Sequence, residues 1–239
     1  MKAMVLAAGK GERFSSFHDT IPKPMARLGD KPVLEHVIDH LRFFEILDII
    51  INLHHLPRVI MDYFGDGAKW GVTIKYSLEP ELLGTAGAIR KVADELKETF
   101  LVYYGDNLCE CDLGKLRGFH RERGGLATIV TAESYDDIAG GVVECAGDGR
   151  LIRFVEKPAV TGSGKRWENG GIYIIEPDII NCIPESEQCD FARDIFPALL
   201  EAGERIYCYE AEGYVRGIDT PERYERVKRE IEEGGLTLR

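Results

Sequence analysis

The stretch that decides the fold is Lys2-Ala3-Met4-Val5-Leu6-Ala7-Ala8-Gly9-Lys10-Gly11, an apolar run that ends in a glycine-rich turn. Residues 2–8 predict a buried strand, residues 33–44 an amphipathic helix and residues 48–52 a second strand. Together they form a βαβ unit. In such units ligands bind beyond the carboxyl ends of the parallel strands. We therefore expect a ligand site at the turn that begins with Gly9.

Strands and helices continue to alternate beyond this unit. The sequence predicts helices over 57–64, 85–98, 191–202 and 221–233, and strands over 72–77, 100–104, 127–133, 141–145, 151–157 and 171–175. We expect one α/β domain with a Rossmann-like, mixed, mostly parallel central sheet covered by helices on both faces. From residue 126 onward the predicted strands follow one another at short intervals, and this change divides the domain into halves at 1–125 and 126–239.

The charge of the chain limits its partners. It has 239 residues, with 30 Lys and Arg against 41 Asp and Glu, a formal net charge of −11. This balance argues against a surface that coats nucleic acid or an anionic membrane. No apolar run approaches the length of a membrane span, and the N-terminus does not resemble a signal peptide. We expect a soluble, cytoplasmic protein.

The cysteines and two histidines are assigned no chemistry. Six cysteines, at 109, 111, 145, 182, 189 and 208, form no Cys-x-x-Cys pair and are expected to be buried or half-buried free thiols. His36 and His40 have a zinc-like i, i+4 spacing. An exposed helical face explains them more simply.

The glycine-rich turn leaves three interpretations open. A dinucleotide-binding loop would need a third glycine where Phe14 stands, and a Walker A loop would need a Gly-Lys-Ser/Thr run that is absent. A tight turn without a ligand is the third interpretation. Pro22-Lys23-Pro24 favours a phosphate site, because two prolines fix the backbone of Lys23 and its ammonium can be held as a positioned cation.

A set of motifs in this order resembles the sugar-1-phosphate nucleotidyltransferases (nucleotide-sugar pyrophosphorylases), with mannose-1-phosphate guanylyltransferases closest. The motifs are Leu6-Ala7-Ala8-Gly9-x-Gly11-x-Arg13, Pro22-Lys23-Pro24-Met25, Leu83-Gly84-Thr85-Ala86-Gly87-Ala88, Gly105-Asp106-Asn107, Phe154-x-Glu156-Lys157-Pro158, Asn169-Gly170-Gly171-Ile172-Tyr173 and Asp190-Phe191-x-x-Asp194-x-Phe196-Pro197. The resemblance covers nearly the whole chain. It implies a nucleotide-binding half at 1–125 and a sugar-phosphate-binding half at 126–239.

The implied reaction joins a nucleoside triphosphate and a sugar 1-phosphate by in-line attack on the α-phosphorus, with Mg²⁺ as cofactor. The resemblance implies that Asp106 is a metal ligand and that Arg13 and Lys23 neutralise the departing pyrophosphate. Asp219 would be the second ligand, although in the common family pattern the acidic residue stands two positions earlier relative to Thr-Pro. The alternative is that Asp219 only caps the last helix. Catalytic roles are thus expected for Arg13, Lys23, Asp106 and Lys157.

The same resemblance implies how the substrates are held. Nucleotide binding is expected of Leu6, Ala7, Ala8, Gly9, Gly11, Glu79, Gly84 and Thr85, and sugar-phosphate binding of Gly141, Glu156, Lys157 and Asn169. Glu79 favours GTP, because a carboxylate accepts side by side from the N1–H and N2–H₂ donors of guanine. Mannose 1-phosphate is the expected sugar, with thymidylyl or uridylyl transfer to glucose 1-phosphate or another sugar phosphate as the alternative.

Two other functions compete with this one. A catalytically silent nucleotide-sugar-sensing subunit is favoured by the shifted Asp219 and by Ser15, which stands where the family often has a second basic residue. An NAD-type binder lacks its third glycine. The expected partners are a nucleoside triphosphate and a sugar 1-phosphate, without nucleic acid or membrane. A homo-oligomer is left open.

Two basic islands fit two phosphorylated substrates. Residues 1–28 carry five basic and two acidic side chains, and residues 150–167 carry five and one. The acidic total therefore conceals two local cationic segments, one with Arg13 and Lys23 and one with Lys157.

Overall fold

The computed structural model of the chain describes residues 1–11, 21–134, 141–156, 166–185 and 188–233. It divides into two compact units. Unit 1 comprises Met1–Leu82, Val102–Cys111 and Gly213–Arg239, and unit 2 comprises Leu83–Leu101 and Asp112–Glu212. Each unit is therefore built from segments distant in sequence, and the division does not follow the chain halves at residue 125.

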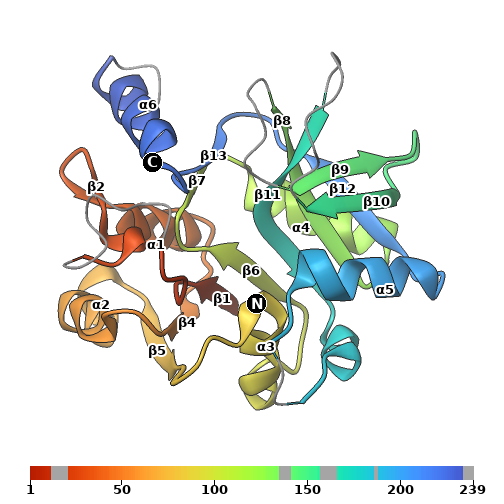
Figure 1. Ribbon diagram of the computed structural model, residues 1–239, viewed down its shortest axis with the longest axis horizontal. Helices are drawn as coiled ribbons and strands as arrows, with labels where there is room; N and C mark the ends of the chain where they lie inside the picture. The colour runs from red at the N-terminus through yellow and green to blue at the C-terminus, as the bar shows by residue number, and fades with distance from the viewer. Residues whose placement is uncertain (12–20, 135–140, 157–165, 186–187, 234–239) are drawn as a thin grey trace. The chain divides into compact units, whose positions relative to one another are not determined.

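The parallel sheet of unit 1 forms around the stretch quoted above. Strand β1 (Ala3–Leu6) pairs in parallel with β4 (Asp48–Leu53), and β4 pairs in parallel with β5 (Thr73–Leu78). Strand β6 (Phe100–Tyr104), which enters unit 1 at Val102, neighbours β1 on its other side. These strands and the first two helices, α1 (Val33–Phe43) and α2 (Pro57–Phe64), can be followed in Figure 1.

The predicted apolar face of α1 is confirmed. Leu34, Val37, Ile38 and Leu41 are all buried. Each buried aliphatic side chain of this size contributes about 1.5–3 kcal/mol to folding. Their spacing therefore fixes which face of α1 packs against the rest of unit 1.

Short elements complete unit 1. They are the 3₁₀ turns η1 (Lys23–Met25) and η2 (Ala68–Trp70), the strands β2 (Arg27–Leu28), β3 (Lys31–Pro32), β7 (Asn107–Cys109) and β13 (Val215–Gly217), and helix α6 (Pro221–Glu232). Strand β13 pairs antiparallel with β7. Tyr224 and Val227 of α6 join Leu28 and Leu108 in one buried cluster. Packing on this cluster holds the last helix in unit 1.

Unit 2 contains a mixed sheet. Strand β8 (Ala127–Ser134) pairs antiparallel with β11 (Arg166–Ile175) and in parallel with β12 (Ile206–Glu210). Strand β9 (Gly141–Cys145) forms an antiparallel hairpin with β10 (Leu151–Glu156) and also pairs with β11.

The helical elements of unit 2 are α3 (Gly84–Lys91), η3 (Ala93–Glu95), α4 (Leu113–Arg123), η4 (Pro177–Cys182), the π-helical turn η5 (Phe191–Ile195) and α5 (Phe196–Glu201). The strands and helices of the two units together confirm the expected α/β class with a mixed, mostly parallel sheet.

Several predicted bounds were wrong. The helix predicted over 85–98 ends at Lys91, and the helix predicted over 191–202 is divided into the turn η5 and helix α5. Pro197 explains this second break, because proline has no N–H to donate and is tolerated only in the first turn of a helix. Helix α4 and strand β12 were not predicted.

The expectation that all cysteines are free was wrong. Cys145 and Cys208 form a disulfide across a sequence separation of 63 residues. The turn between β9 and β10 lies against β12, since Cys208 donates its backbone N–H to the Gly149 carbonyl at 2.8 Å. Sequence spacing carries no signal for a pair brought together by sheet topology. Cys109, Cys111, Cys182 and Cys189 are free thiols.

The exposed-face interpretation of the two α1 histidines was also wrong, since both are buried. His36 Nε2 lies 2.9 Å from the Leu28 carbonyl, and His40 Nε2 lies 2.9 Å from the Cys111 carbonyl. Burial lowers the pKa of His36. Both histidines therefore serve as buried hydrogen-bonding residues of unit 1.

Among the helices that the structure describes, none combines the length and the apolar character required to cross a bilayer.

Candidate functional site

The glycine-rich turn is held at the end of β1 by two backbone contacts. The Leu6 carbonyl accepts from the Gly105 N–H at 2.9 Å, and the Ala7 N–H donates to Asn52 Oδ1 at 2.9 Å. A Cβ at Gly105 would lie 3.1 Å from the Leu6 carbonyl oxygen, tighter than most real contacts. Glycine thus allows the Gly105-Asp106 turn to approach β1, and the predicted ligand turn and the predicted metal ligand Asp106 meet in unit 1.

Lys23 lies beside the same turn. Gly11 has a φ of +67°, which favours glycine, and a Cβ added there would be 3.3 Å from Lys23 Cβ. Pro22, with a φ of −65°, accepts from the Met25 N–H at 2.7 Å and so begins the η1 turn. The prolines therefore fix the backbone of Lys23 as predicted. Arg13 lies outside the described residues.

An ion pair joins two of the predicted catalytic residues. The Lys23 ammonium contacts the Asp106 carboxylate, and each side chain is about one sixth exposed, at 15% and 16%. Because both groups are partly shielded from water, their attraction is stronger than that of an exposed surface pair. The structure therefore brings a predicted phosphate-binding cation directly onto a predicted metal ligand.

The small β7–β13 ladder brings Asp219 to the same end of unit 1. Gly217 pairs with Asn107, and Ile218 N–H donates to the Asp106 carbonyl at 3.1 Å. A Cβ at Gly217 would lie 2.9 Å from Asn107 Oδ1, so glycine lets the two strands pair without displacing the Asn107 side chain. Asp219 follows one residue later, next in sequence to the residue bonded to Asp106.

Asp219 is not the cap of the last helix, so that alternative was wrong. Thr220 is the N-cap of α6, and its hydroxyl accepts from the Arg223 N–H at 3.3 Å. The Arg223 guanidinium lies 3.5 Å from Asp219 Oδ1. Two carboxylates, Asp106 and Asp219, each associated with a basic side chain, thus lie just beyond the same end of the β7–β13 ladder.

Glu79, the residue predicted to bind the base, is buried with 4% exposure. Its Oε1 accepts from Asn52 Nδ2 at 2.8 Å. Asn52 is itself buried, and its Oδ1 is the atom bonded to the Ala7 N–H. Sequence reasoning missed Asn52. Its polar side chain within the otherwise apolar run Ile49–Leu53 is the sequence signal that could have singled it out.

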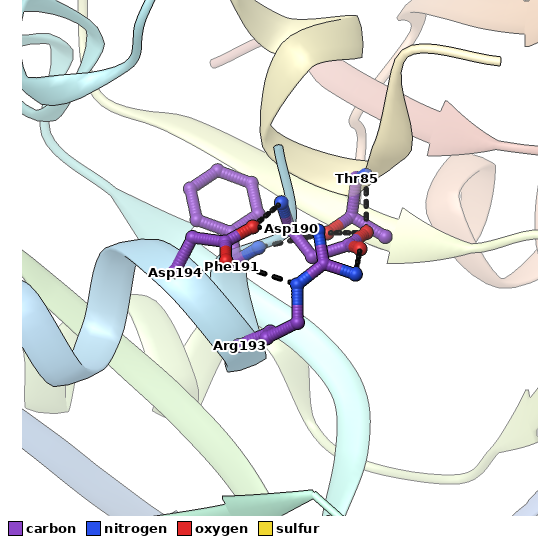
Figure 2. A network of polar contacts seen from close by, with 5 residues as sticks. All are labelled: Thr85, Asp190, Phe191, Arg193 and Asp194. Carbon is purple, nitrogen blue, oxygen red and sulfur yellow. Dashed lines mark hydrogen bonds and ion pairs between the residues drawn. The ribbon is translucent and has the colours of Figure 1, made fainter. Parts of the chain in front are cut away.

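The predicted nucleotide residues Gly84 and Thr85 begin α3 in unit 2, where a polar network holds Thr85 (Figure 2). Asp190 Oδ1 accepts from both the N–H and the hydroxyl of Thr85, at 2.9 and 3.2 Å. The Thr85 hydroxyl in turn accepts from the Phe191 N–H at 2.9 Å. Arg193 binds Asp194 through two bonds of 2.9 Å and lies 3.2 Å from Asp190 Oδ2.

The first N–H groups of α3 are consequently bonded within the protein. Ala86 and Gly87 both donate to the Cys189 carbonyl, at 2.9 and 3.1 Å. Gly84 has a φ of +75°, and a Cβ there would collide with that carbonyl. The start of this helix is thus clamped to residues 189–194 and does not present these donors to a phosphate.

The predicted sugar-binding residues also lie in unit 2. Asn169 donates to the Tyr173 hydroxyl at 2.7 Å and accepts from the Gly171 N–H at 3.0 Å. Gly141 pairs with Glu156 across the β9–β10 hairpin. A Cβ at Gly141 would meet the Phe154 ring at 2.5 Å, so the space left by this glycine is filled by Phe154. Lys157 lies outside the described residues.

A cavity of about 920 Å³ opens elsewhere in unit 2, at the carboxyl end of α3. Two of its cations are paired, Arg90 with Glu185 and Lys97 with Asp94. Its lining includes no residue predicted for the site. Size alone does not make it the functional site, because the described residues that are predicted to bind phosphate or metal do not line it.

Comparisons with known proteins show which family the chain resembles over nearly its whole length. The sequence profile of the family described as nucleotidyl transferase matches residues 2–234. UTP--glucose-1-phosphate uridylyltransferase from Synechocystis sp. is 39% identical over 221 residues, which are 87% of this chain and 57% of that protein. Mannose-1-phosphate guanylyltransferase from Mycobacterium tuberculosis is 33% identical over 97% of this chain and 65% of that protein.

A solved structure agrees with these matches. HddC from Yersinia pseudotuberculosis is 26% identical and has a TM-score of 0.83 over 96% of this chain and 99% of that one, and the same values hold for its complex with GMP-PN. This chain spans less than two thirds of the length of the two curated relatives, at 57% and 65%.

Proposed function

Because the chain belongs to the nucleotidyl transferase family, as its motifs predicted, we propose that it transfers a nucleotidyl group from a nucleoside triphosphate to a sugar 1-phosphate. An oxygen of the sugar phosphate attacks the α-phosphorus and forms the new P–O bond. The bond from the α-phosphorus to the bridging oxygen of the β-phosphate breaks, and pyrophosphate leaves with that electron pair.

One observation carries this proposal: the glycine-rich turn, Lys23, Asp106 and Asp219 gather at one end of unit 1. Their approach depends on Gly11, Gly105 and Gly217, at which a side chain would be crowded. Bringing two polyanions together requires positioned positive charge more than covalent chemistry by the protein. Lys23 supplies such a charge, and the prolines beside it limit the backbone freedom lost on binding.

The two carboxylates fit a divalent cation. Mg²⁺ takes oxygen ligands, commonly one or two carboxylates together with phosphate oxygens and water. Asp106 and Asp219 would hold it, and the described residues contain no group of three or more His, Cys, Asp and Glu that would form a complete protein cage. When bound, Mg²⁺ neutralises negative charge on the phosphates as they react. Lys23, now paired with Asp106, would then turn to the substrate phosphates.

The remaining predicted residues complete the proposal. Lys157 would contact the sugar phosphate as a compact cation, Glu156 would accept from sugar hydroxyls, and Arg13 would help to neutralise the leaving pyrophosphate. Asn169 would present its amide to the sugar from a geometry fixed by Gly171 and Tyr173. Gly141 would act indirectly, since it makes room for Phe154 beneath the hairpin.

We propose GTP and mannose 1-phosphate as the substrates. Glu79 offers the acceptor-only carboxylate that suits the two donors of guanine, and the relatives include mannose-1-phosphate guanylyltransferases and a structure complexed with GMP-PN. UTP and glucose 1-phosphate are the second candidate pair, favoured by the 39% identity to the Synechocystis uridylyltransferase.

The test is pyrophosphate release over a matrix of nucleoside triphosphates and sugar 1-phosphates with Mg²⁺. We expect turnover with GTP and mannose 1-phosphate, and a loss of at least about 100-fold in Asp106→Asn, as for other removed electrostatic groups of an active site. Asp94→Asn, at an exposed carboxylate paired with Lys97, is the control and should keep full activity.

The other outcomes separate the alternatives. Turnover with UTP and not GTP would overturn the choice of base while leaving the reaction intact. Binding of nucleotide without turnover in any combination would favour the silent sensing subunit instead.

A further inference from the structure

The polar groups of Glu79 are held by three consecutive residues at the end of β4. The carboxylate Oε1 accepts from Asn52 Nδ2 at 2.8 Å, the backbone N–H donates to the Leu53 carbonyl at 2.7 Å, and the backbone carbonyl accepts from His54 Nδ1 at 2.8 Å. A carbonyl oxygen can only accept, so Nδ1 of His54 carries the proton in this contact. Glu79 is thereby fixed in both backbone and side chain.

Asn52 connects this carboxylate to the glycine-rich turn. Its amide oxygen accepts from the Ala7 N–H at 2.9 Å while its amide nitrogen donates to Glu79. The amide can serve both ends because it has an acceptor and two donors, which neither a carboxylate nor an aliphatic side chain of the same size has. Asn52 is 3% exposed, so each of these bonds forms away from bulk water.

We propose that Asn52 is the positioning residue that sets base selectivity, by locking Glu79 to the Ala7 peptide. This inference rests on the proposed function, since it requires a nucleotide base beside Glu79. A buried carboxylate without its amide donor would change rotamer or recruit water. The distance between the base-binding group and the backbone that receives the nucleotide would then no longer be fixed.

Ser77 provides a matched control. It pairs with Asn52 across the β4–β5 register and is buried, and its hydroxyl makes no hydrogen bond in the part of the chain that the structure describes. Ser77→Ala removes a polar group at the same depth without touching the Ala7–Asn52–Glu79 connection. It should leave base selectivity unchanged.

The test is the ratio of GTP to UTP dissociation constants, measured by calorimetry without a sugar phosphate, together with kcat and KM for both nucleotides. In Asn52→Ala we expect this ratio to move toward one by about ten- to a hundredfold, the range for a lost hydrogen bond to a charged group. The KM for sugar 1-phosphate should stay within about twofold, because Asn52 makes no described contact with the sugar-binding residues.

Two further variants keep the test valid if Asn52→Ala does not fold. Asn52→Asp preserves shape and the acceptor for Ala7 but faces Glu79 with a second carboxylate, so selectivity should fall as in Asn52→Ala. Combining Asn52→Asp with Glu79→Gln exchanges the two groups, so that the amide at position 79 donates to the carboxylate at position 52. The double variant should then recover the binding lost in Asn52→Asp and shift preference toward UTP, whose base offers a donor beside an acceptor.

The possible failures are distinguishable. If the unmodified protein discriminates between bases and Asn52→Ala discriminates equally well, the role of Asn52 is refuted while the proposed function stands. If the unmodified protein binds no nucleotide at all, the proposed function is refuted, and the inference with it.

Discussion

The clamp at the start of α3, formed by the hydrogen bonds of Thr85 with Asp190 and Phe191, leads to a quantitative prediction for Thr85→Val. Valine keeps the shape of threonine but loses the hydroxyl that donates to Asp190 at 3.2 Å and accepts from the Phe191 N–H at 2.9 Å. Leaving the N–H of buried Phe191 unpaired costs about 1–3 kcal/mol, and the lost bond to Asp190 about 1 kcal/mol. Because Thr85 is itself half-buried, water recovers part of this cost. We expect a loss of about 2 kcal/mol in the free energy of unfolding of unit 2.

Urea denaturation followed by tryptophan fluorescence measures this loss. Trp70 lies in unit 1 and Trp167 in unit 2, so a Trp70→Phe background makes the signal report on unit 2 alone. With a slope of about 2 kcal/mol per M, the midpoint should fall by about 1 M. Thr73→Val is the control, because Thr73 is exposed on β5 of unit 1, and it should shift the midpoint by less than about 0.3 M. A change below about 0.5 kcal/mol in Thr85→Val would refute the account of the clamp.

Three other changes have defined outcomes. Thr220→Ala should lower the free energy of unfolding by about 1 kcal/mol through the lost cap of α6. Asp219→Asn leaves this cap in place and weakens only the 3.5 Å pairing with Arg223, so it should cost less than about 1 kcal/mol while it reduces Mg²⁺ affinity. Denaturation and titration calorimetry on both variants decide this, and an unchanged Mg²⁺ affinity in Asp219→Asn would contradict a role as metal ligand. Replacing Cys145 and Cys208 together by serine should lower the free energy of unfolding by about 4 kcal/mol, because the disulfide closes a loop with a sequence separation of 63 residues. Reduction of the unmodified protein should reproduce that loss in a thermal melt. The pKa of His36 is lowered by burial, so the unfolded chain binds the proton more readily as the pH falls below about 6.5, and stability should decline there. His36→Gln should flatten this decline below about pH 6.5, and an unchanged slope would contradict this cause.

Local pattern was sufficient for much of the fold. The helix predicted over 57–64 and the strand predicted over 100–104 have the observed bounds, because a proline at the helix start and a continuous apolar run mark them clearly. Helix α4 escaped prediction because Gly114 and Gly118 weaken its pattern. Asp112, whose side chain accepts from the Lys115 N–H at 2.9 Å, is the capping signal that would have indicated it.

The non-local arrangements could not be obtained from spacing. The Cys145–Cys208 disulfide and the Asp106–Asp219 neighbourhood both depend on strand pairings between segments more than 60 residues apart. Asn52 is similar, because its two partners lie 45 and 27 residues away in opposite directions. A sequence motif identified Glu79 and Ala7 separately, and only the fold shows the amide that joins them.

The most direct test of the proposed reaction follows the fate of each phosphate. GTP labelled with ³²P at the α or at the γ position is incubated with mannose 1-phosphate and Mg²⁺, and the products are separated. We predict that the α label appears in the nucleotide-sugar and the γ label in pyrophosphate. Transfer of the γ label to the sugar phosphate, or release of either label only as inorganic phosphate, would contradict attack at the α-phosphorus.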